Sequence, residues 1–86
     1  MLKVVLQYTD CLQDGRNVFR VLASNKVEIL KTKTGSSIYP KITICIDDYN
    51  KLNNILYDLS YACNYEVRVV KVKKLENKIK VLRGEL

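Results

Sequence analysis

The stretch that decides the fold runs over residues 39–72, YPKITICIDDYNKLNNILYDLSYACNYEVRVVKV. Its first part has isoleucines at every second position, Ile42, Ile44 and Ile46, which is the alternation of a half-buried strand. An apolar stripe with helical spacing follows, made of Leu52, Ile55, Leu56, Leu59 and Cys63. A run rich in valine then predicts another strand at residues 66–73. Strand, helix and strand in this order form one half of a split βαβ sandwich.

The upstream part of the chain repeats this order. Residues 2–8 alternate between apolar and polar positions and predict the first strand. Residues 16–24 predict a short helix, although an apolar run of this length also fits a strand. Residues 26–33 predict a strand with Val27 and Ile29 directed inward. The sequence therefore predicts an α+β fold, a ferredoxin-like βαββαβ sandwich with a four-stranded antiparallel sheet and two helices on one face.

Turn and cap residues mark the boundaries between these elements. Residues 9–15, TDCLQDG, predict a loop in which Asp14 supplies an acceptor for the backbone N–H groups of the first helix. The TGSS cluster at residues 34–37 predicts a hairpin. Asp47 or Asp48 is expected to cap the second helix, where a carboxylate also complements the helix dipole.

The C-terminal part of the chain contains one more predicted boundary. Asn64 is expected to end the second helix in the left-handed conformation. We expect residues 1–73 to form one ferredoxin-like domain and residues 74–86 to form a basic extension. Within that extension, residues 77–83 fit an additional hairpin strand better than a helix, because an asparagine turn precedes a β-branched run.

Composition narrows the class of function. The 86 residues are 48% hydrophobic and 28% charged, which are ordinary globular values without a membrane span, and the N-terminus lacks a signal peptide, so we expect a cytoplasmic protein. Three widely spaced cysteines and the absence of histidine argue against a disulfide framework and a metal site. We expect no cofactor, and no carboxylate pair suits acid–base catalysis, so we expect a non-enzyme.

The net charge of +6 favours an anionic partner such as a nucleotide, a nucleic acid or an acidic protein, although it also serves solubility. Basic residues gather toward the C-terminus, which makes that segment the candidate surface for an anionic partner. These residues are Arg68, Lys71, Lys73, Lys74, Lys78, Lys80 and Arg83.

The arrangement of LKVVLQYTD, DGRNVFRVLASNKVEIL and ITICIDDYNKLNNILYDLSYACNYEVRVVKV resembles an ACT domain, a small regulatory module of amino-acid metabolism and of stringent-response synthetases. The resemblance covers residues 2–72. Such domains usually carry an Asp and a Gly in the loop entering the first helix, where effectors bind at a subunit interface. Here Asp10, Asp14 and Gly15 occupy that loop, without the usual Asp-x-x-Gly spacing.

The same loop holds the candidate ligand-binding residues Asp14, Gly15, Arg16 and Asn17. Gly15 lets a ligand approach backbone N–H groups at a helix N-terminus, which is a favourable anion site. Arg16 and Asn17 are able to bond phosphate or carboxylate oxygens. The alternative is that Gly15 is a turn glycine and its neighbours are solvated surface residues.

The face of the sheet away from the helices has two further features. Val5, Leu30, Cys45 and Val70 are expected to form an apolar patch there, which indicates a homodimer or higher oligomer. Six tyrosines suit base stacking or the rim of a small core, yet none is expected in the middle of this face.

Two functions follow from these features. The first is a non-enzymatic regulatory or sequestering protein, an ACT-like oligomer that holds a small anionic effector, a nucleotide or an amino acid, between subunits. The alternative is a basic interaction or inhibitor module that docks on nucleic acid or on an acidic protein surface. Strong salt dependence distinguishes the second function, because counterion release grows with the number of phosphates neutralised.

Overall fold

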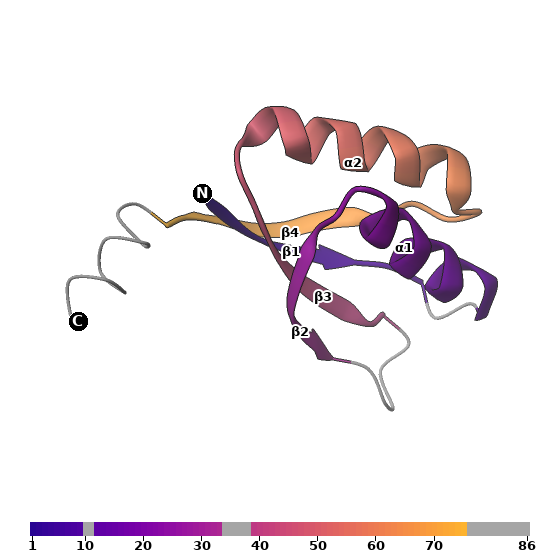
Figure 1. Cartoon of the computed structure of the whole chain (residues 1–86). Coiled ribbons are helices and arrows are strands. Elements are labelled where there is room, and N and C mark those ends of the chain that lie inside the picture. Colours follow the sequence, from indigo (N-terminus) through magenta and orange to yellow (C-terminus); the bar gives the residue numbers. More distant parts are fainter. Residues whose placement is uncertain (10–11, 34–38, 76–86) are drawn as a thin grey trace.

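The computed structural model describes residues 1–9, 12–33 and 39–75. Its elements are β1 (Leu2–Gln7), α1 (Leu12–Ser24), β2 (Glu28–Lys33), β3 (Lys41–Ile46), α2 (Tyr49–Ala62) and β4 (Arg68–Lys74). The strands form one antiparallel sheet in the order β2-β3-β1-β4, and both helices lie on the same side of it (Figure 1). The predicted ferredoxin-like sandwich is therefore confirmed. The predicted turn at 34–37 and additional strand at 77–83 lie outside the described residues.

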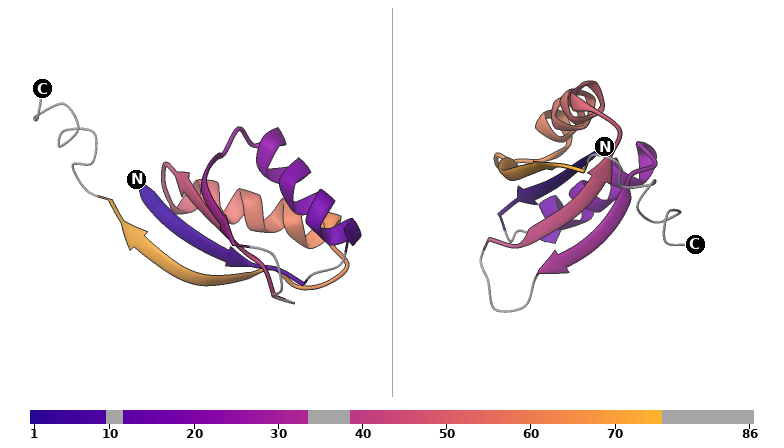
Figure 2. Two further views of the ribbon diagram at one scale, coloured as in Figure 1. Left: turned by 90° about the horizontal axis from the view of Figure 1, so that it is seen from below. Right: turned by 90° about the vertical axis from the view of Figure 1, so that its left-hand side faces the viewer.

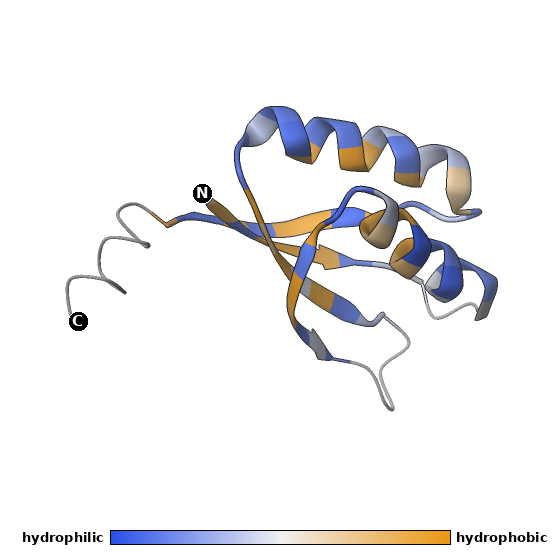
Figure 3. Ribbon diagram, viewed as in Figure 1, coloured by the Kyte–Doolittle hydropathy of each residue, from blue (hydrophilic) through white to orange (hydrophobic). Residues whose placement is uncertain are grey.

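The core lies between the two helices and the inner face of the two central strands. Every second residue of β1 and β3 is buried there: Leu2, Val4, Leu6, Ile42, Ile44 and Ile46. The helices contribute Val18, Val21, Leu22, Leu52, Ile55 and Leu59. Both helices are apolar toward the sheet and polar away from it (Figure 3). The predicted strand alternation and helix stripe are thus confirmed, with Leu56 and Cys63 at the partly buried margin of the stripe.

The edge strand β2 is less covered than the sequence predicts. Val27, just before β2, packs partly against the core. Ile29 pairs with Ile44 and so lies on the inner side of the sheet, but 37% of it stays exposed. The prediction that Ile29 is directed inward is therefore confirmed, and it stays partly exposed because an edge strand has a neighbouring strand on one side only.

Helix α1 begins earlier than predicted and ends in a compact backbone motif. It starts at Leu12, so the second half of the predicted loop 9–15 is helical. At its other end, Lys26 has a φ of 57°, its N–H bonds the carbonyl of Ala23, and the N–H of Val27 bonds the carbonyl of Leu22. This pair of hydrogen bonds is the Schellman motif, here with lysine at the left-handed position where glycine is usual.

Helix α2 has a conventional start and an extended end. Asp48 is the N-cap, and its side chain accepts a hydrogen bond from the N–H of Lys51 at 3.0 Å, which confirms the predicted cap. At the C-terminal end, Cys63 is extended, with a φ of −103°. The left-handed conformation predicted for Asn64 is wrong, since among the described residues other than glycine only Lys26 has a positive φ. Neither helix in the described part of the chain is long and apolar enough to cross a membrane.

Candidate anion-binding site

The first turn of α1 holds the predicted ligand residues, but two of them bind the protein itself. Asp14 is fully buried, and its two carboxylate oxygens accept hydrogen bonds from the N–H groups of Asn64 (2.8 Å) and Tyr65 (2.9 Å). The side chain of Asn17 donates to the carbonyl of Ala62 at 2.7 Å. Asp14 and Asn17 therefore join α1 to the end of α2 and to the segment that follows it.

The predicted role of Asp14 as an acceptor for its own helix is wrong. It occupies the third position of α1, and its carboxylate reaches across to the segment after α2. Gly15 lies inside the helix, where an added Cβ would meet Tyr8 Cε2 at an ordinary 3.8 Å. Neither an unusual backbone conformation nor close packing requires glycine there. Arg16 is exposed, so this turn does not bring the four side chains together around one ligand position.

The buried carboxylate also affects a neighbouring thiol. Cys63 is half-buried, and its Sγ lies 4.0 Å from the main-chain carbonyl oxygen of Asp14. Burial raises the pKa of the Cys63 thiol, and the negative charge of Asp14 raises it further. The thiol therefore stays protonated, which is the opposite of what a cysteine nucleophile needs.

Neither helix covers the outer face of the sheet (Figure 2). Basic residues of all four strands lie on this face. Strand pairing aligns them in three rows across β2, β3, β1 and β4. The rows are Glu28, Cys45, Lys3, Lys73; then Lys31, Thr43, Val5, Lys71; then Lys33, Lys41, Gln7, Arg68. Of these twelve positions, seven are basic and one, Glu28, is acidic. We call this surface the lysine face.

The lysine face places like charges directly opposite each other. Lys3 pairs with Lys73 across β1 and β4, and Lys33 pairs with Lys41 across β2 and β3. Like charges at opposed positions of an antiparallel pair destabilise the sheet. Within residues 1–9, 12–33 and 39–75, the one ion pair joins Arg68 Nε to Glu66 Oε1 at 3.5 Å. The six lysines of the face are therefore not neutralised by any carboxylate of the described chain.

Two irregularities in the edge strands flank the middle row. The pairing register shifts at Leu30 in β2 and at Val70 in β4, so each is an extra residue opposite its partner strand. Such bulges bend a strand and increase its twist, and they are frequent beside binding sites. They adjoin the level of the Thr43–Val5 pair from opposite sides, Leu30 toward Ile44 and Val70 toward Leu6. Both edges of the sheet are thus bent beside the middle row.

A hollow of about 370 Å³ occupies the centre of this face. Its basic residues are Lys3, Lys31, Lys71 and Lys73, from three different strands, and its uncharged residues are Val5, Leu30 and Thr43. We call it the lysine hollow. Four ammonium groups around one space suit a ligand with several negative oxygens, such as a phosphate chain, and the uncharged residues suit less polar parts of the same ligand.

The structure divides the predicted basic surface. Arg68, Lys71 and Lys73 lie on the lysine face, whereas Lys74 pairs with Leu2 and so belongs to the other side of the sheet. The remaining predicted residues, Lys78, Lys80 and Arg83, lie outside the described residues. Sequence reasoning missed the contributions of Lys3, Lys31, Lys33 and Lys41. The signal was available for Lys3 and Lys41, which take the polar alternate positions of their strands, whereas Lys31 and Lys33 reach this face only through the bulge at Leu30.

The predicted apolar patch is interleaved with these lysines. Val5 and Cys45 are half-buried, while Leu30 and Val70 are 44% and 47% exposed. Val5 and Leu30 line the lysine hollow, so the apolar residues are surrounded by charge. Over the described residues, no three cysteine, aspartate or glutamate side chains lie close enough to hold a metal ion.

The fold is a ferredoxin-like sandwich whose sheet has one open face. Among solved structures, the chain is similar to the ACT domain from the GTP pyrophosphokinase of Chlorobium tepidum, with a TM-score of 0.57 and 12% identity. The match covers 80% of this chain and 95% of that chain. The resemblance to an ACT domain is thus confirmed at the level of the fold. No protein-family model and no curated protein matches the sequence.

Proposed function

We propose that this protein is a non-enzymatic binding protein that holds a small phosphorylated ligand in the lysine hollow, as an ACT-like regulator or as a sequestering protein. The observation that carries the proposal is the pairing of Lys3 with Lys73 and of Lys33 with Lys41 on an uncovered face. A chain that places like charges opposite each other loses stability, and a bound anion removes that loss.

The dimensions and chemistry of the hollow support a small ligand. Its volume of about 370 Å³ lies within the range of sites that bind metabolites. Its four lysines come from β1, β2 and β4, which the sheet holds in a fixed register. Binding elements on strands are positioned more accurately than those on loops. A preformed site of this kind spends little binding energy on ordering itself.

Two potentially reactive groups of the described residues, Cys63 and Asp14, have environments that favour binding without chemistry. The sequence contains no histidine, and the raised pKa of Cys63 keeps that thiol protonated. The buried carboxylate of Asp14 already accepts two backbone hydrogen bonds. Neither group has the environment of a nucleophile or a general base.

The proposal includes an oligomer whose formation depends on the charge of the lysine face. Two copies facing each other through the lysine face would bring lysine against lysine, and an anion between them would remove the repulsion. We therefore expect dimerisation through this face to require the ligand. Native mass spectrometry of protein purified without denaturation tests this, since a dimer should carry a discrete added mass. A dimer that persists after all anions are removed would contradict it.

Charge-neutral variants test the lysine hollow directly. Lys31→Gln combined with Lys71→Gln should weaken binding of inorganic triphosphate about tenfold in calorimetry, taking about 0.7 kcal/mol for each exposed ionic contact. The matched control, Arg20→Gln combined with Lys51→Gln, removes the same charge from the two helices. Equal losses in both variants would mean that net charge, and not the hollow, attracts the anion.

The predicted site at the first turn of α1 is tested by the same titration. Arg16→Gln removes its exposed cation, and Gly15→Val adds a side chain inside the helix. If the lysine hollow is the site, neither variant changes triphosphate affinity beyond the Arg20→Gln control. A selective loss in Arg16→Gln would move the site to α1.

A nucleic acid is the second candidate ligand, because basic residues cover all three rows and not the hollow alone. Lys33 and Lys41 lie in the row beyond the hollow, next to Gln7 and Arg68. Lys33→Gln combined with Lys41→Gln should weaken the binding of nucleic acid and leave the affinity for triphosphate unchanged. The slope of log affinity against log salt gives the number of phosphates contacted, which exceeds that for a small ligand.

A further inference from the structure

A second cavity adjoins the lysine face at the end of the sheet where β1 finishes and β4 begins. Its volume is about 480 Å³, and three of its residues are tyrosines: Tyr8, Tyr39 and Tyr65. Tyr8 is buried, whereas Tyr39 and Tyr65 are 52% and 58% exposed. An aromatic cavity beside a basic face is not required by the packing of the core, since the buried cluster of this small domain includes only Tyr8 of the three.

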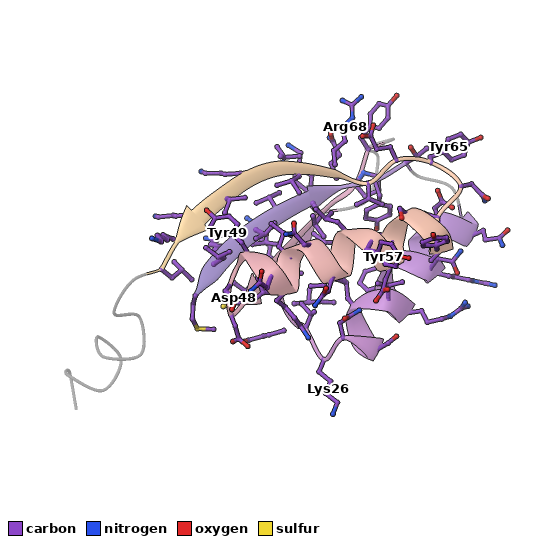
Figure 4. The ribbon with its side chains drawn as sticks, turned by 90° about the horizontal axis from the view of Figure 1, so that it is seen from above. Lys26, Asp48, Tyr49, Tyr57, Tyr65 and Arg68 are labelled. Carbon is purple, nitrogen blue, oxygen red and sulfur yellow. The ribbon has the colours of Figure 1, made fainter. Side chains whose placement is uncertain are left out.

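The cavity and the lysine face share two residues. Gln7 and Arg68 line the cavity, and they are paired with each other in the third row of the face. Figure 4 shows Arg68 and Tyr65 together at the end of α2 that leads into β4, with Tyr49 at the opposite end of that helix. The tyrosine cavity and the lysine hollow are therefore neighbouring parts of one surface.

The spacing between the two parts suits a phosphorylated nucleoside. Along β1, Gln7 borders the cavity, Val5 lines the hollow, and Lys3 lies at its far side. Each step of two residues along a strand advances about 7 Å on the same face. A base, a ribose and a phosphate chain together cover a comparable length. Along this line the protein presents aromatic, then polar, then cationic side chains, which is the order that the base, the ribose and the phosphates of such a ligand require.

We propose that the ligand of the lysine hollow is a nucleoside polyphosphate, with its base against Tyr39 and Tyr65 and its phosphates among the lysines. This proposal rests on the proposed function and narrows it to one class of ligand. Aromatic rings stack on any base, so stacking supplies affinity. Glu66 and Gln7 at the cavity supply hydrogen-bond acceptors and donors for a base edge, and Arg68 lies between the base and the phosphates.

The test compares nucleotides with the phosphate chain alone. Calorimetry on the full chain at one ionic strength uses inorganic triphosphate and the four common ribonucleoside triphosphates. At least one nucleotide should bind about tenfold more tightly than triphosphate, because stacking of one base contributes on the order of 1–3 kcal/mol. Equal affinity of all four nucleotides and triphosphate would overturn the proposal while leaving the proposed function intact.

A pair of tyrosine variants locates the base. Tyr65→Leu should abolish the advantage of the nucleotide and leave triphosphate affinity unchanged. Tyr49→Leu is the matched control, since Tyr49 is 55% exposed and lies at the other end of α2. It should change neither affinity. A nucleotide advantage that survives Tyr65→Leu would overturn the placement of the base.

Two further results separate this proposal from the proposed function. In the unaltered protein, tyrosine ring resonances should shift on adding the nucleotide and not on adding triphosphate, which tests the base site without any variant. Nucleotide binding that Lys31→Gln with Lys71→Gln leaves unchanged would contradict the proposed function and this proposal together. If triphosphate does not bind at all, the proposed function is contradicted, and the narrower nucleotide proposal, which rests on it, is contradicted with it.

Discussion

The two faces of the sheet differ in how completely their interactions are satisfied. On the inner face, Val4, Leu6, Ile42 and Ile44 are fully buried against the helices. Every buried side-chain nitrogen and oxygen of the described residues has a hydrogen-bond partner. On the outer face, the same two strands place Lys3 and Lys41 among other cations, and neither forms an ion pair with a carboxylate of the described residues. One side of each strand therefore stabilises the fold, and the other side is available for binding.

The two faces also differ in how closely they follow the rules of local stability. The inner face follows every rule of stability, with alternating apolar residues and a satisfied buried carboxylate. The outer face violates one rule repeatedly, by opposing like charges. Sites of function are where local rules fail without a structural gain. In this protein the exception lies on the face that the helices leave open.

The largest expected effect is the loss of a core side chain. Ile44→Ala should lower the free energy of unfolding by about 2–5 kcal/mol, because the removed atoms leave a cavity at a fully buried position. Thr43→Ala, one residue earlier on the outer face, should cost at most about 1 kcal/mol. Urea unfolding followed by circular dichroism gives both values. Similar losses at the two positions would remove the contrast between the faces.

The next effect comes from the buried carboxylate beside the core. Asp14→Ala should lower the free energy of unfolding by about 2–3 kcal/mol, since two backbone N–H groups lose a charged acceptor. Amide exchange at Asn64 and Tyr65 should accelerate. Asp58→Ala is the control, because that exposed carboxylate also accepts a hydrogen bond across the helices, from Asn25. A small effect of Asp14→Ala would mean that water replaces the lost acceptor.

Features encoded by adjacent residues were predictable from the sequence. The alternation of Ile42, Ile44 and Ile46 decided which side of β3 is buried, and Asp48 capped α2 as expected. The start of α1 was not predictable in this way. Asp14 and Gly15 are typical of turns, yet both are helical here because the Asp14 carboxylate is held by N–H groups 50 and 51 residues away.

The candidate site depends on strand register, which no local pattern reveals. Lys3 and Lys73 are 70 positions apart in the sequence, and only the pairing of β1 with β4 places them side by side. The bulge at Leu30 shifts the pairing of β2 with β3 by one residue, the bulge at Val70 does the same for β4 with β1, and each reverses the faces beyond it. Simple alternation along β4 predicts Val70 in the centre of the outer face, where the structure places Lys71.

A smaller effect tests whether the lysine face gives up stability for binding. Lys73→Glu places a carboxylate opposite Lys3, so it should raise the free energy of unfolding by about 0.2–1 kcal/mol and at the same time weaken triphosphate binding. Arg20→Glu makes the same change of net charge on the exposed surface of α1. Urea unfolding and calorimetry on both variants provide the comparison. If Lys73→Glu lowers the free energy of unfolding, the opposed lysines do not destabilise the free protein.

The smallest effect concerns Cys63, at the margin of the inner side. Its pKa is raised in the folded state, so the folded chain keeps a proton that the unfolded chain loses above about pH 8.5. The contribution of this thiol to stability is therefore complete at neutral pH and declines as the pH rises from about 8.5 through the raised value. The difference in unfolding free energy between the unaltered protein and Cys63→Ala should shrink over that range.

The two causes of this shift are separable. Burial is the larger cause and the charge of Asp14 the smaller, so Asp14→Asn should keep the first and remove the second. Alkylation of Cys63, measured against pH in a background with Cys11→Ser and Cys45→Ser, should then show a pKa that falls only part of the way toward its ordinary value. A complete return would mean that the inner side opens at this margin when Asp14 loses its charge. The satisfied carboxylate, and not apolar packing, would then be what closes the junction between α1 and the end of α2.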